Sequence, residues 1–390
     1  MDIRAASKYS NPVEAFTFQR VMTHVEMENP MSHSRSARAA IALLLAGWAV
    51  TARAEDHGRT LVVTMTNDPV ANAVKVYDAD TRALIQTLST NGRGGVDGSA
   101  RAVRQSDGHT IAIVNNGSNT VAIFRRDGDA LQFDHLVTTS SAPVSVDFAN
   151  DHMYVAGATT VDSFVVHGGS IGPLDGTTNL VLAGGATPAS GSTAQVGAVS
   201  ANQLLVTLKT DPDPGTIDVV SLDDRGRIDG GVTAVPAPAG SLTPFGFVAY
   251  PDGTAVVTLA HSSQDALFRD GAFASVTSAG QIASCWMTRD GKYVFAANTG
   301  SHTISRVIGT GSHVFIDNPV AAPIAGGAPA DIDAVSGVLG VVDHGAGQSH
   351  VTLFVYNEFG ELAPLGAPIT VGVPNATGIA VLVRSNQGRN

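Results

Sequence analysis

Short apolar runs alternate with small polar turns along most of the chain. Residues 111–124 read IAIVNNGSNTVAIF, residues 293–307 read YVFAANTGSHTISRV, and residues 61–77 read LVVTMTNDPVANAVKVY. Two apolar runs around a turn that contains Asn or Gly predict a β-hairpin. The pattern returns roughly every 40 to 50 residues, which predicts radial or linear repetition of one supersecondary unit.

Turn dipeptides indicate how many units there are. Each lies between two apolar runs, as a tight β-turn requires, and together they are Asp107-Gly108, Asn150-Asp151, Ala201-Asn202, Asp252-Gly253, Asp290-Gly291 and Ser336-Gly337. With a further unit at residues 61–89 they give seven. Seven four-stranded antiparallel sheets around one axis predict an all-β fold, the seven-bladed β-propeller. In the sixth blade we expect strands at residues 282–288, 293–298 and 303–308, and a fourth near Phe315.

The last apolar run, GIAVLV at residues 378–383, has no unit of its own. If it becomes the inner strand of the blade formed by the N-terminal segment, the ring closes by hydrogen bonds between the two ends of the chain. No open sheet edge then remains at the junction. The sequence therefore predicts closure by pairing of N- and C-terminal strands.

Residues 1–54 have a different character. Arg35 and Arg38 precede the apolar residues 39–50, which end at Ala52-Arg53-Ala54, and this is the three-part layout of a secretory signal. The run is shorter than the roughly 20 residues of a membrane anchor. We expect cleavage after Ala54, a single propeller over residues 55–390, a periplasmic or extracellular location, and no membrane attachment after cleavage. Residues 1–30 resemble neither core nor signal, so we favour Met31 as the start of translation.

Composition narrows the classes of partner. Charged residues make up 15% of the chain, aromatic residues 6%, and there are 42 glycines, which fits short strands joined by tight turns. The net charge is −11, and about −13 without residues 1–54. Phosphate backbones repel such a body, so nucleic acid is excluded as a partner. Cys285 is the single cysteine, so no internal disulfide can form.

Four of these phrases also carry a family resemblance: TNDPVANAVKVYD, VNNGSNTVAIF, MYVAGATTVDSFVV and CWMTRDGKYVFAANTGSHTISRV. They resemble the lactonase-type seven-bladed propellers with YVTN-like repeats, which include bacterial 6-phosphogluconolactonase and the fungal carboxymuconate cyclase. The resemblance covers about residues 60–383. It implies the propeller fold and an activity on sugar lactones or muconolactones.

The sequence also departs from that family. Its cytosolic lactonases typically carry His-Pro at blade starts and an Arg/His/Glu cluster around the central pocket. This chain has no His-Pro, and at the equivalent positions it has Ala142-Pro143, Thr243-Pro244 and Ala328-Pro329. An exported protein would also not meet phosphogluconolactone in ordinary metabolism, so we do not expect that substrate.

Candidate site residues follow from the strand order. In antiparallel blades, the loop before each inner strand and the loop between the second and third strands emerge on one face. There, His344 with Asp343 beside Arg101 would supply a base and oxyanion donors for opening a lactone; the alternative is that they only line a wet channel. We expect a small molecule in the central channel, bound by Trp286, His261, Asn298, Asn115, Lys209 and Asp331.

Three of these assignments have competing interpretations. Trp286 is either a platform for a ring or a residue packed between blades. His344, His350 and Asp343 could together reach one ion, but their spacing matches no established metal motif, and we expect neither a metal nor another cofactor. Cys285 has no histidine close in sequence and is expected to be a small buried hydrophobe.

Two functions stay open at this point. The first is an exported propeller that binds a small polar cyclic molecule and hydrolyses a lactone. The second is a non-catalytic propeller in the periplasm that binds a ligand or docks another exported protein. The loop at residues 209–215, KTDPDPG, favours the second function, because its prolines would stiffen it for surface recognition.

Overall fold

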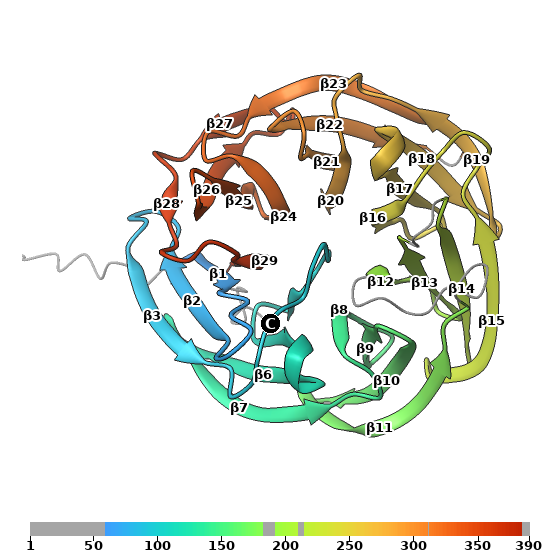
Figure 1. Cartoon of the computed structure of the whole chain (residues 1–390), viewed down its shortest axis with the longest axis horizontal. Helices are drawn as coiled ribbons and strands as arrows, with labels where there is room; N and C mark the ends of the chain where they lie inside the picture. Colours follow the sequence, from blue (N-terminus) through green and yellow to red (C-terminus); the bar gives the residue numbers. More distant parts are fainter. Residues whose placement is uncertain (1–58, 182–191, 210–213, 311, 384–390) are drawn as a thin grey trace, which may run out of the picture. The chain divides into compact units, whose positions relative to one another are not determined.

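A computed structural model describes residues 59–181, 192–209, 214–310 and 312–383. The expected signal segment, its cleavage after Ala54 and the start at Met31 lie outside these residues, as does the middle of the loop at 209–215. The described residues belong to one compact unit that begins at Ala54. They form seven sheets arranged as blades around an axis, so the seven-bladed propeller is confirmed (Figure 1).

The first three blades come from the N-terminal half of the chain. From the axis outward they consist of β29 (Thr377–Leu382), β1 (Leu61–Met65), β2 (Ala73–Asp78) and β3 (Leu84–Ser89); of β4 (Val103–Ser106), β5 (Thr110–Asn115), β6 (Thr120–Asp127) and β7 (Ala130–Thr138); and of β8 (Pro143–Ala149), β9 (His152–Gly157), β10 (Thr160–His167) and β11 (Ser170–Asn179).

The other four blades follow in chain order. They consist of β12 (Thr193–Ser200), β13 (Gln203–Leu208), β14 (Thr216–Leu222) and β15 (Ile228–Pro236); of β16 (Pro244–Ala249), β17 (Ala255–Leu259), β18 (Gln264–Arg269) and β19 (Ala272–Thr277); of β20 (Ser284–Asp290), β21 (Tyr293–Asn298), β22 (Thr303–Gly309) and β23 (Val314–Pro323); and of β24 (Ala328–Val335), β25 (Val338–Gly345) and β26 (Gln348–Tyr356), which pairs with both β27 (Leu362–Pro364) and β28 (Ile369–Thr370). The sixth blade matches the expected strands to within two residues at most of their ends.

Burial follows the distance from the ring's outer edge. The second strands are buried along nearly their whole length, as β5 and β25 show, whereas outer strands such as β3 and β19 alternate between exposed and half-buried positions. Each blade is therefore covered on both faces by its neighbours near the axis, and solvent reaches it only at the rim. The predicted turn dipeptides all lie between first and second strands.

Pairing of the two chain ends closes the ring. β29 pairs antiparallel with β1, in the register Leu61 with Leu382 and Thr64 with Ile379. The Thr64 hydroxyl donates to the Gly378 carbonyl at 2.7 Å, beside a bulge in the pairing. The predicted closure by N- and C-terminal strands is confirmed.

One connection between blades crosses the axis. The segment at residues 90–102, which we call the channel loop, links β3 to β4 and reaches into the middle of the ring (Figure 1). Its Ala100 N–H donates to the Ala194 carbonyl on β12 at 2.9 Å, and its Ser99 carbonyl accepts the indole N–H of Trp286 on β20 at 2.7 Å. The channel loop therefore separates two hollows, one at each mouth of the channel.

Candidate functional site

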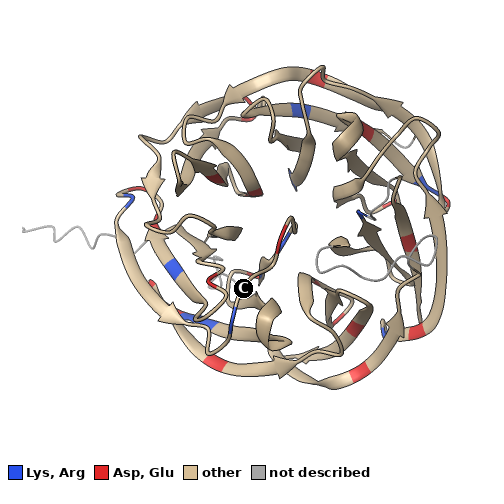
Figure 2. Cartoon of the chain, viewed as in Figure 1, with Lys and Arg blue, Asp and Glu red and all other residues tan. Residues whose placement is uncertain are grey.

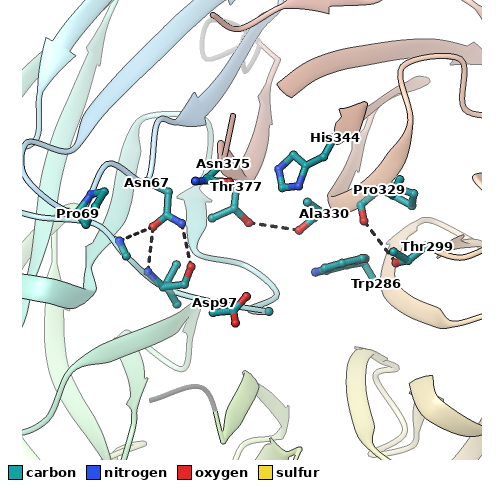
Figure 3. Close-up of a pocket in the computed structure, with 14 residues that line it drawn as sticks. Asn67, Pro69, Asp97, Trp286, Thr299, Pro329, Ala330, His344, Asn375 and Thr377 are labelled. Atoms are coloured by element: carbon teal, nitrogen blue, oxygen red, sulfur yellow. Dashed lines mark hydrogen bonds between the residues drawn. The ribbon is translucent and has the colours of Figure 1, made fainter. Parts of the chain in front are cut away.

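The first hollow, the loop-side pocket, opens on the face predicted to carry the loops. Its volume is about 490 Å³ (Figure 3). The ends of second strands and the loops that follow them contribute Asn67, Thr299 and His344, and segments before inner strands contribute Asp97 and Asn375. The expectation that these two sets of loops share one face is confirmed by this lining.

His344 lies at the end of β25 with its ring on the wall of this pocket (Figure 3). Its Nε2 is 2.7 Å from the Ala376 carbonyl oxygen, which can only accept, so Nε2 carries the proton. In the neutral ring, Nδ1 then has a lone pair. Gly327, with φ of 145°, makes this arrangement possible, because a Cβ there would lie 2.1 Å from the His344 carbonyl oxygen.

Asp343 lies beside His344 in sequence but faces the protein interior. It is fully buried, and its Oδ2 accepts the hydroxyl of Thr352 at 2.6 Å. Its other oxygen is 3.4 Å from Nδ1 of His350, and burial raises the pKa of the Asp343 carboxyl. Asp343 and His350 therefore face each other without a hydrogen bond between these two atoms, and neither residue lines the loop-side pocket. Among the described residues, no group of three or more His, Cys, Asp or Glu side chains is placed to hold a metal ion.

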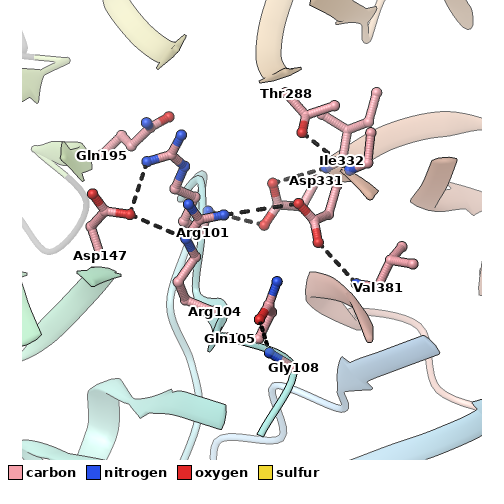
Figure 4. Close-up of polar contacts among 12 residues, drawn as sticks. Arg101, Arg104, Gln105, Gly108, Asp147, Gln195, Thr288, Asp331, Ile332 and Val381 are labelled. Atoms are coloured by element: carbon pink, nitrogen blue, oxygen red, sulfur yellow. Dashed lines mark hydrogen bonds and ion pairs between the residues drawn. The ribbon is translucent and has the colours of Figure 1, made fainter. Parts of the chain in front are cut away.

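Arg101 lines the second hollow rather than the first. This turn-side pocket, of about 390 Å³, is lined by the last residues of inner strands, including Asp147, Thr288 and Asp333, and by Arg101 and Arg104. The guanidinium of Arg101 donates to Asp147 at 3.2 Å (Figure 4). The three predicted catalytic residues are thus distributed over the loop-side pocket, the protein interior and the turn-side pocket.

Three predicted binding residues, Trp286, Lys209 and Asp331, hold the channel loop. Trp286 donates to Ser99 and packs edge-on against Phe245, with ring centroids 5.4 Å apart. Lys209 donates to the carbonyls of Asp97 and Gly98 at 2.8 and 2.6 Å, and burial lowers its pKa to about 8. Of the three, Trp286 also lines the loop-side pocket.

Asp331 supports the base of the channel loop. One carboxyl oxygen accepts the backbone N–H of Arg101 at 3.0 Å, and the other accepts that of Ile332 at 2.9 Å. Arg101 has a φ of 59°, so this contact stabilises a residue in the left-handed region. Burial raises the pKa of Asp331 to about 8.

The remaining candidates lie outside both pockets. Asn115 and Asn298 are fully buried at the ends of second strands, where their amides donate to Thr120 and Thr303 across the turn. His261 is exposed in the short helix η3 (Ala260–Ser262). Cys285 is half-buried, and burial raises the pKa of its thiol to about 11, which agrees with the unreactive cysteine expected from the sequence.

Sequence reasoning missed Asp97, Arg104 and Asp147. Asp97 is exposed on the channel loop and lines the loop-side pocket. The only signal for it is the glycine-rich stretch at residues 92–98, which marks a connection too long for a tight turn. Arg104 and Asp147 belong to inner strands, where the sequence alone does not say which side chains reach the axis.

Charge differs between the two pockets. The described residues that line the loop-side pocket include a carboxylate, that of Asp97, but no lysine or arginine. The turn-side pocket contains three arginines and three aspartates. Figure 2 shows both signs of charge on the segment that reaches into the ring, and both signs also on the outer strands of the ring.

Comparisons with known proteins give structural neighbours only. The sequence matches no family model, and it matches no curated protein. A candidate 6-phosphogluconolactonase from Bacteroides uniformis has a TM-score of 0.61 at 15% identity, over 83% of this chain and 99% of the other. The periplasmic gluconolactonase of Pseudomonas aeruginosa has a TM-score of 0.59 at 16% identity, over 84% and 99%.

A third neighbour has a different activity in its name. A catalytically inactive virginiamycin B lyase from Staphylococcus aureus, solved with quinupristin, has a TM-score of 0.52 at 12% identity, over 73% of this chain and 92% of the other. Proteins that share this fold are therefore named for different activities. At these identities the similarity to this chain concerns the fold alone. The chain has the seven-bladed propeller fold of the lactonase-type structures, as its repeated phrases predicted.

Proposed function

We propose that the loop-side pocket binds an uncharged sugar lactone and that His344 promotes its opening by water. The observation that carries this proposal is the tautomer of His344. Because Nε2–H donates to the Ala376 carbonyl, the ring is fixed and Nδ1 keeps a lone pair for a proton. No other histidine or cysteine lines this pocket among the described residues.

The reaction needs few groups. Nδ1 of His344 takes a proton from a water molecule as that water adds to the lactone carbonyl carbon. The ring C–O bond then breaks, and the imidazolium returns the proton to the departing alkoxide, which leaves a hydroxy acid. Side-chain amides such as that of Asn375, an exposed residue of the lining, are suitable donors to the oxyanion that forms.

The charge of the pocket favours an uncharged substrate. A phosphorylated lactone would need cations around its phosphate, and the described lining has neither lysine nor arginine. Asp97 instead offers a carboxylate that accepts hydrogen bonds from the hydroxyl groups of a sugar ring. The product is a carboxylate, which Asp97 repels, so the same residue assists its release. A periplasmic gluconolactonase is among the structural neighbours, which agrees with this substrate class.

We further propose that the protein acts outside the cytoplasm. The basic, apolar and small-residue regions at 31–54 support this, since they have the layout of a secretory signal. An unphosphorylated lactone also fits such a compartment better than a phosphorylated intermediate.

The experiment compares two substrates and two histidines. Protein beginning at Glu55 is incubated with D-glucono-1,5-lactone or its 6-phospho derivative, at a pH where spontaneous opening is slow. We expect turnover of the uncharged lactone to exceed that of the phosphorylated one. His344→Ala should reduce kcat/KM roughly 100- to 1,000-fold, the usual contribution of a general base.

His261→Ala is the matched control, because His261 is a loop histidine outside the lining of either pocket. The proposal is wrong if no lactone opens faster than in buffer, or if both variants retain the wild-type rate. Saturable binding of the lactone without turnover would instead support the non-catalytic, ligand-binding function.

A further inference from the structure

The turn-side pocket has no part in the proposed reaction. It lies on the other side of the channel loop from His344, between the last residues of the inner strands. Its wall is partly apolar, through Phe148, Val248 and Val335, and partly charged. In the charged part, two guanidiniums form hydrogen bonds with a single carboxylate.

Two guanidinium groups share one carboxylate in this pocket. Nη1 of Arg101 and Nε of Arg104 lie 3.2 and 3.1 Å from the same oxygen of Asp147 (Figure 4). The second oxygen of Asp147 accepts the backbone N–H of Ala198 at 3.2 Å. Asp147 is nearly buried, and Arg101 and Arg104 are mostly so, with side chains 16% and 27% exposed. Solvent therefore screens their mutual repulsion only in part.

The neighbouring carboxyl groups, Asp331 and Asp333, form no hydrogen bond with these two guanidiniums. Asp331 accepts two backbone N–H groups, and with its pKa raised to about 8 by burial it is mostly uncharged at pH 7. Asp333 accepts the N–H of Val381 at 2.9 Å, its other oxygen is 3.9 Å from Nη1 of Arg104, and burial raises its pKa as well. Among the described residues, Asp147 is thus the one carboxylate that forms hydrogen bonds with the side chains of Arg101 and Arg104.

The two other charged residues of the lining, Arg289 and Asp290, make contacts outside this cluster. Arg289 donates to the Gly291 carbonyl at 2.7 Å and lies over the Tyr250 ring, 5.0 Å from its centroid. Asp290 accepts the hydroxyl of Tyr356. In the described part of the chain, Asp290 forms no ion pair with Arg101 or Arg104.

Among the described residues, the Nη edge of Arg104 has one long contact, the 3.9 Å ion pair of Nη1 with Asp333. Its Nε holds Asp147, and within the described residues neither Nη nitrogen makes a hydrogen bond. The two Nη groups form the planar fork that binds a carboxylate in a bidentate manner. Arg101, by contrast, has both Nη nitrogens in use, on Asp147 and on the Phe247 carbonyl.

We propose that the turn-side pocket is a binding site for a small monocarboxylate, which Arg104 holds through its Nη edge while the apolar wall contacts the ligand's carbon chain. The two guanidiniums share a single hydrogen-bonded carboxylate, so a ligand with one negative charge supplies the second, whereas a dianion would be repelled more strongly by Asp147. Such a carboxylate has two possible sources, a hydroxy acid formed by lactone opening or an unrelated small acid. The site itself does not depend on the proposed lactonase activity.

Calorimetric titration at constant ionic strength tests this, with sodium D-gluconate, sodium L-lactate and sodium sulfate as probes. We expect gluconate or lactate to saturate a single site on wild-type protein. Arg104→Gln should weaken that binding at least tenfold. Arg104→Lys keeps the charge beside Asp147 but loses the fork, so it should also bind more weakly and serves if the glutamine variant does not fold.

His344→Ala is the matched control from the other pocket, and it should bind the carboxylate like wild type even though it lacks the proposed activity. Tighter binding of gluconate than lactate would identify the lactone product as the source, and similar binding would indicate a general carboxylate site. The proposal is overturned by no saturation up to about 10 mM, where a ligand with Kd near 1 mM is mostly bound. It is also overturned by equal or tighter binding of sulfate, by unchanged binding in both Arg104 variants, or by loss of binding in His344→Ala.

Discussion

The loop-side and turn-side pockets belong to one ring and share two of its blades, the sixth and the seventh, yet their chemistry differs. The loop-side pocket has a fixed histidine, an exposed carboxylate and no cationic side chain in its described lining. The turn-side pocket has two guanidiniums around one carboxylate. The blades are repeats, so the difference arises from the irregular parts: the loops at one mouth, the inner-strand ends at the other, and the channel loop between them.

The channel loop should matter most to stability through Trp286, which is 7% exposed and makes the hydrogen bond to Ser99. We expect Trp286→Ala to lower the free energy of unfolding by about 3–4 kcal/mol. The substitution creates a cavity, and it removes the donor of a buried hydrogen bond, so the Ser99 carbonyl loses its partner. Urea unfolding followed by circular dichroism measures this. Trp286→Phe keeps the contact with Phe245 and should cost clearly less.

The same substitution tests whether the two pockets are separate. If Trp286 anchors the loop between them, Trp286→Ala should weaken both lactone turnover and carboxylate binding, whereas His344→Ala affects only the first and Arg104→Gln only the second. Loss of one function alone in Trp286→Ala would show that the channel loop is held by its other contacts, such as the bond between Ala100 and Ala194.

The next largest effect should come from Asp147, the shared anion of the turn-side pocket. Asp147→Asn leaves two mostly buried guanidiniums facing each other, and we expect it to lower the free energy of unfolding by about 2–3 kcal/mol. The control is Asp134→Asn in the more exposed pair of Arg125 and Asp134, which should cost about 1 kcal/mol or less. Similar losses in both variants would contradict the role of Asp147 as a mostly buried carboxylate shared by two arginines. Urea unfolding at low and high salt also separates them, since salt screens the exposed pair more.

The sequence predicted the ring, the turns and the closure because these depend on local chemistry. A turn dipeptide between apolar runs, or a strand left without a partner, needs no knowledge of distant residues. It also predicted which loops share a face, so His344 and Trp286 were correctly associated with one mouth. Strand order in an antiparallel blade is sufficient for that.

The sequence did not predict which side chains meet. Neighbouring residues of a strand point to opposite sides, so Asp343 is buried against Thr352 while His344 reaches the pocket. Asn115 and Asn298 end their strands with side chains folded back onto the turn. Arg101 was placed by the path of the channel loop, and that path depends on contacts with Ala194, Lys209 and Trp286, far away in sequence.

The contacts that hold the channel loop should also respond to pH, with Asp331, which accepts the backbone N–H of Arg101, giving the larger effect. Its pKa in the folded protein, about 8, lies above the ordinary 3.8, so the folded state holds a proton that the unfolded state has released. The resulting stability is fully present below about pH 4 and is lost as pH rises through 8. We expect the urea midpoint of wild type to fall relative to that of Asp331→Asn between pH 5 and 9. Parallel pH profiles would show that the carboxyl is ionised throughout.

Lys209, which contacts the channel loop near the loop-side pocket, should give the smaller and opposite response. Its pKa of about 8 lies below the ordinary 10.5, so the folded state releases a proton that the unfolded state keeps, and stability rises with pH between about 8 and 10.5. Because the side chain is partly in solvent, we expect this rise to be less than about 1 kcal/mol. This rise in stability should be absent in Lys209→Met and retained in Lys75→Met, because Lys75 lies on the third strand of its blade.

Tryptophan fluorescence offers a second measurement, because Trp286 is the single tryptophan in protein beginning at Glu55. Its fluorescence should shift over the same pH range only if Lys209 and Trp286 hold one loop.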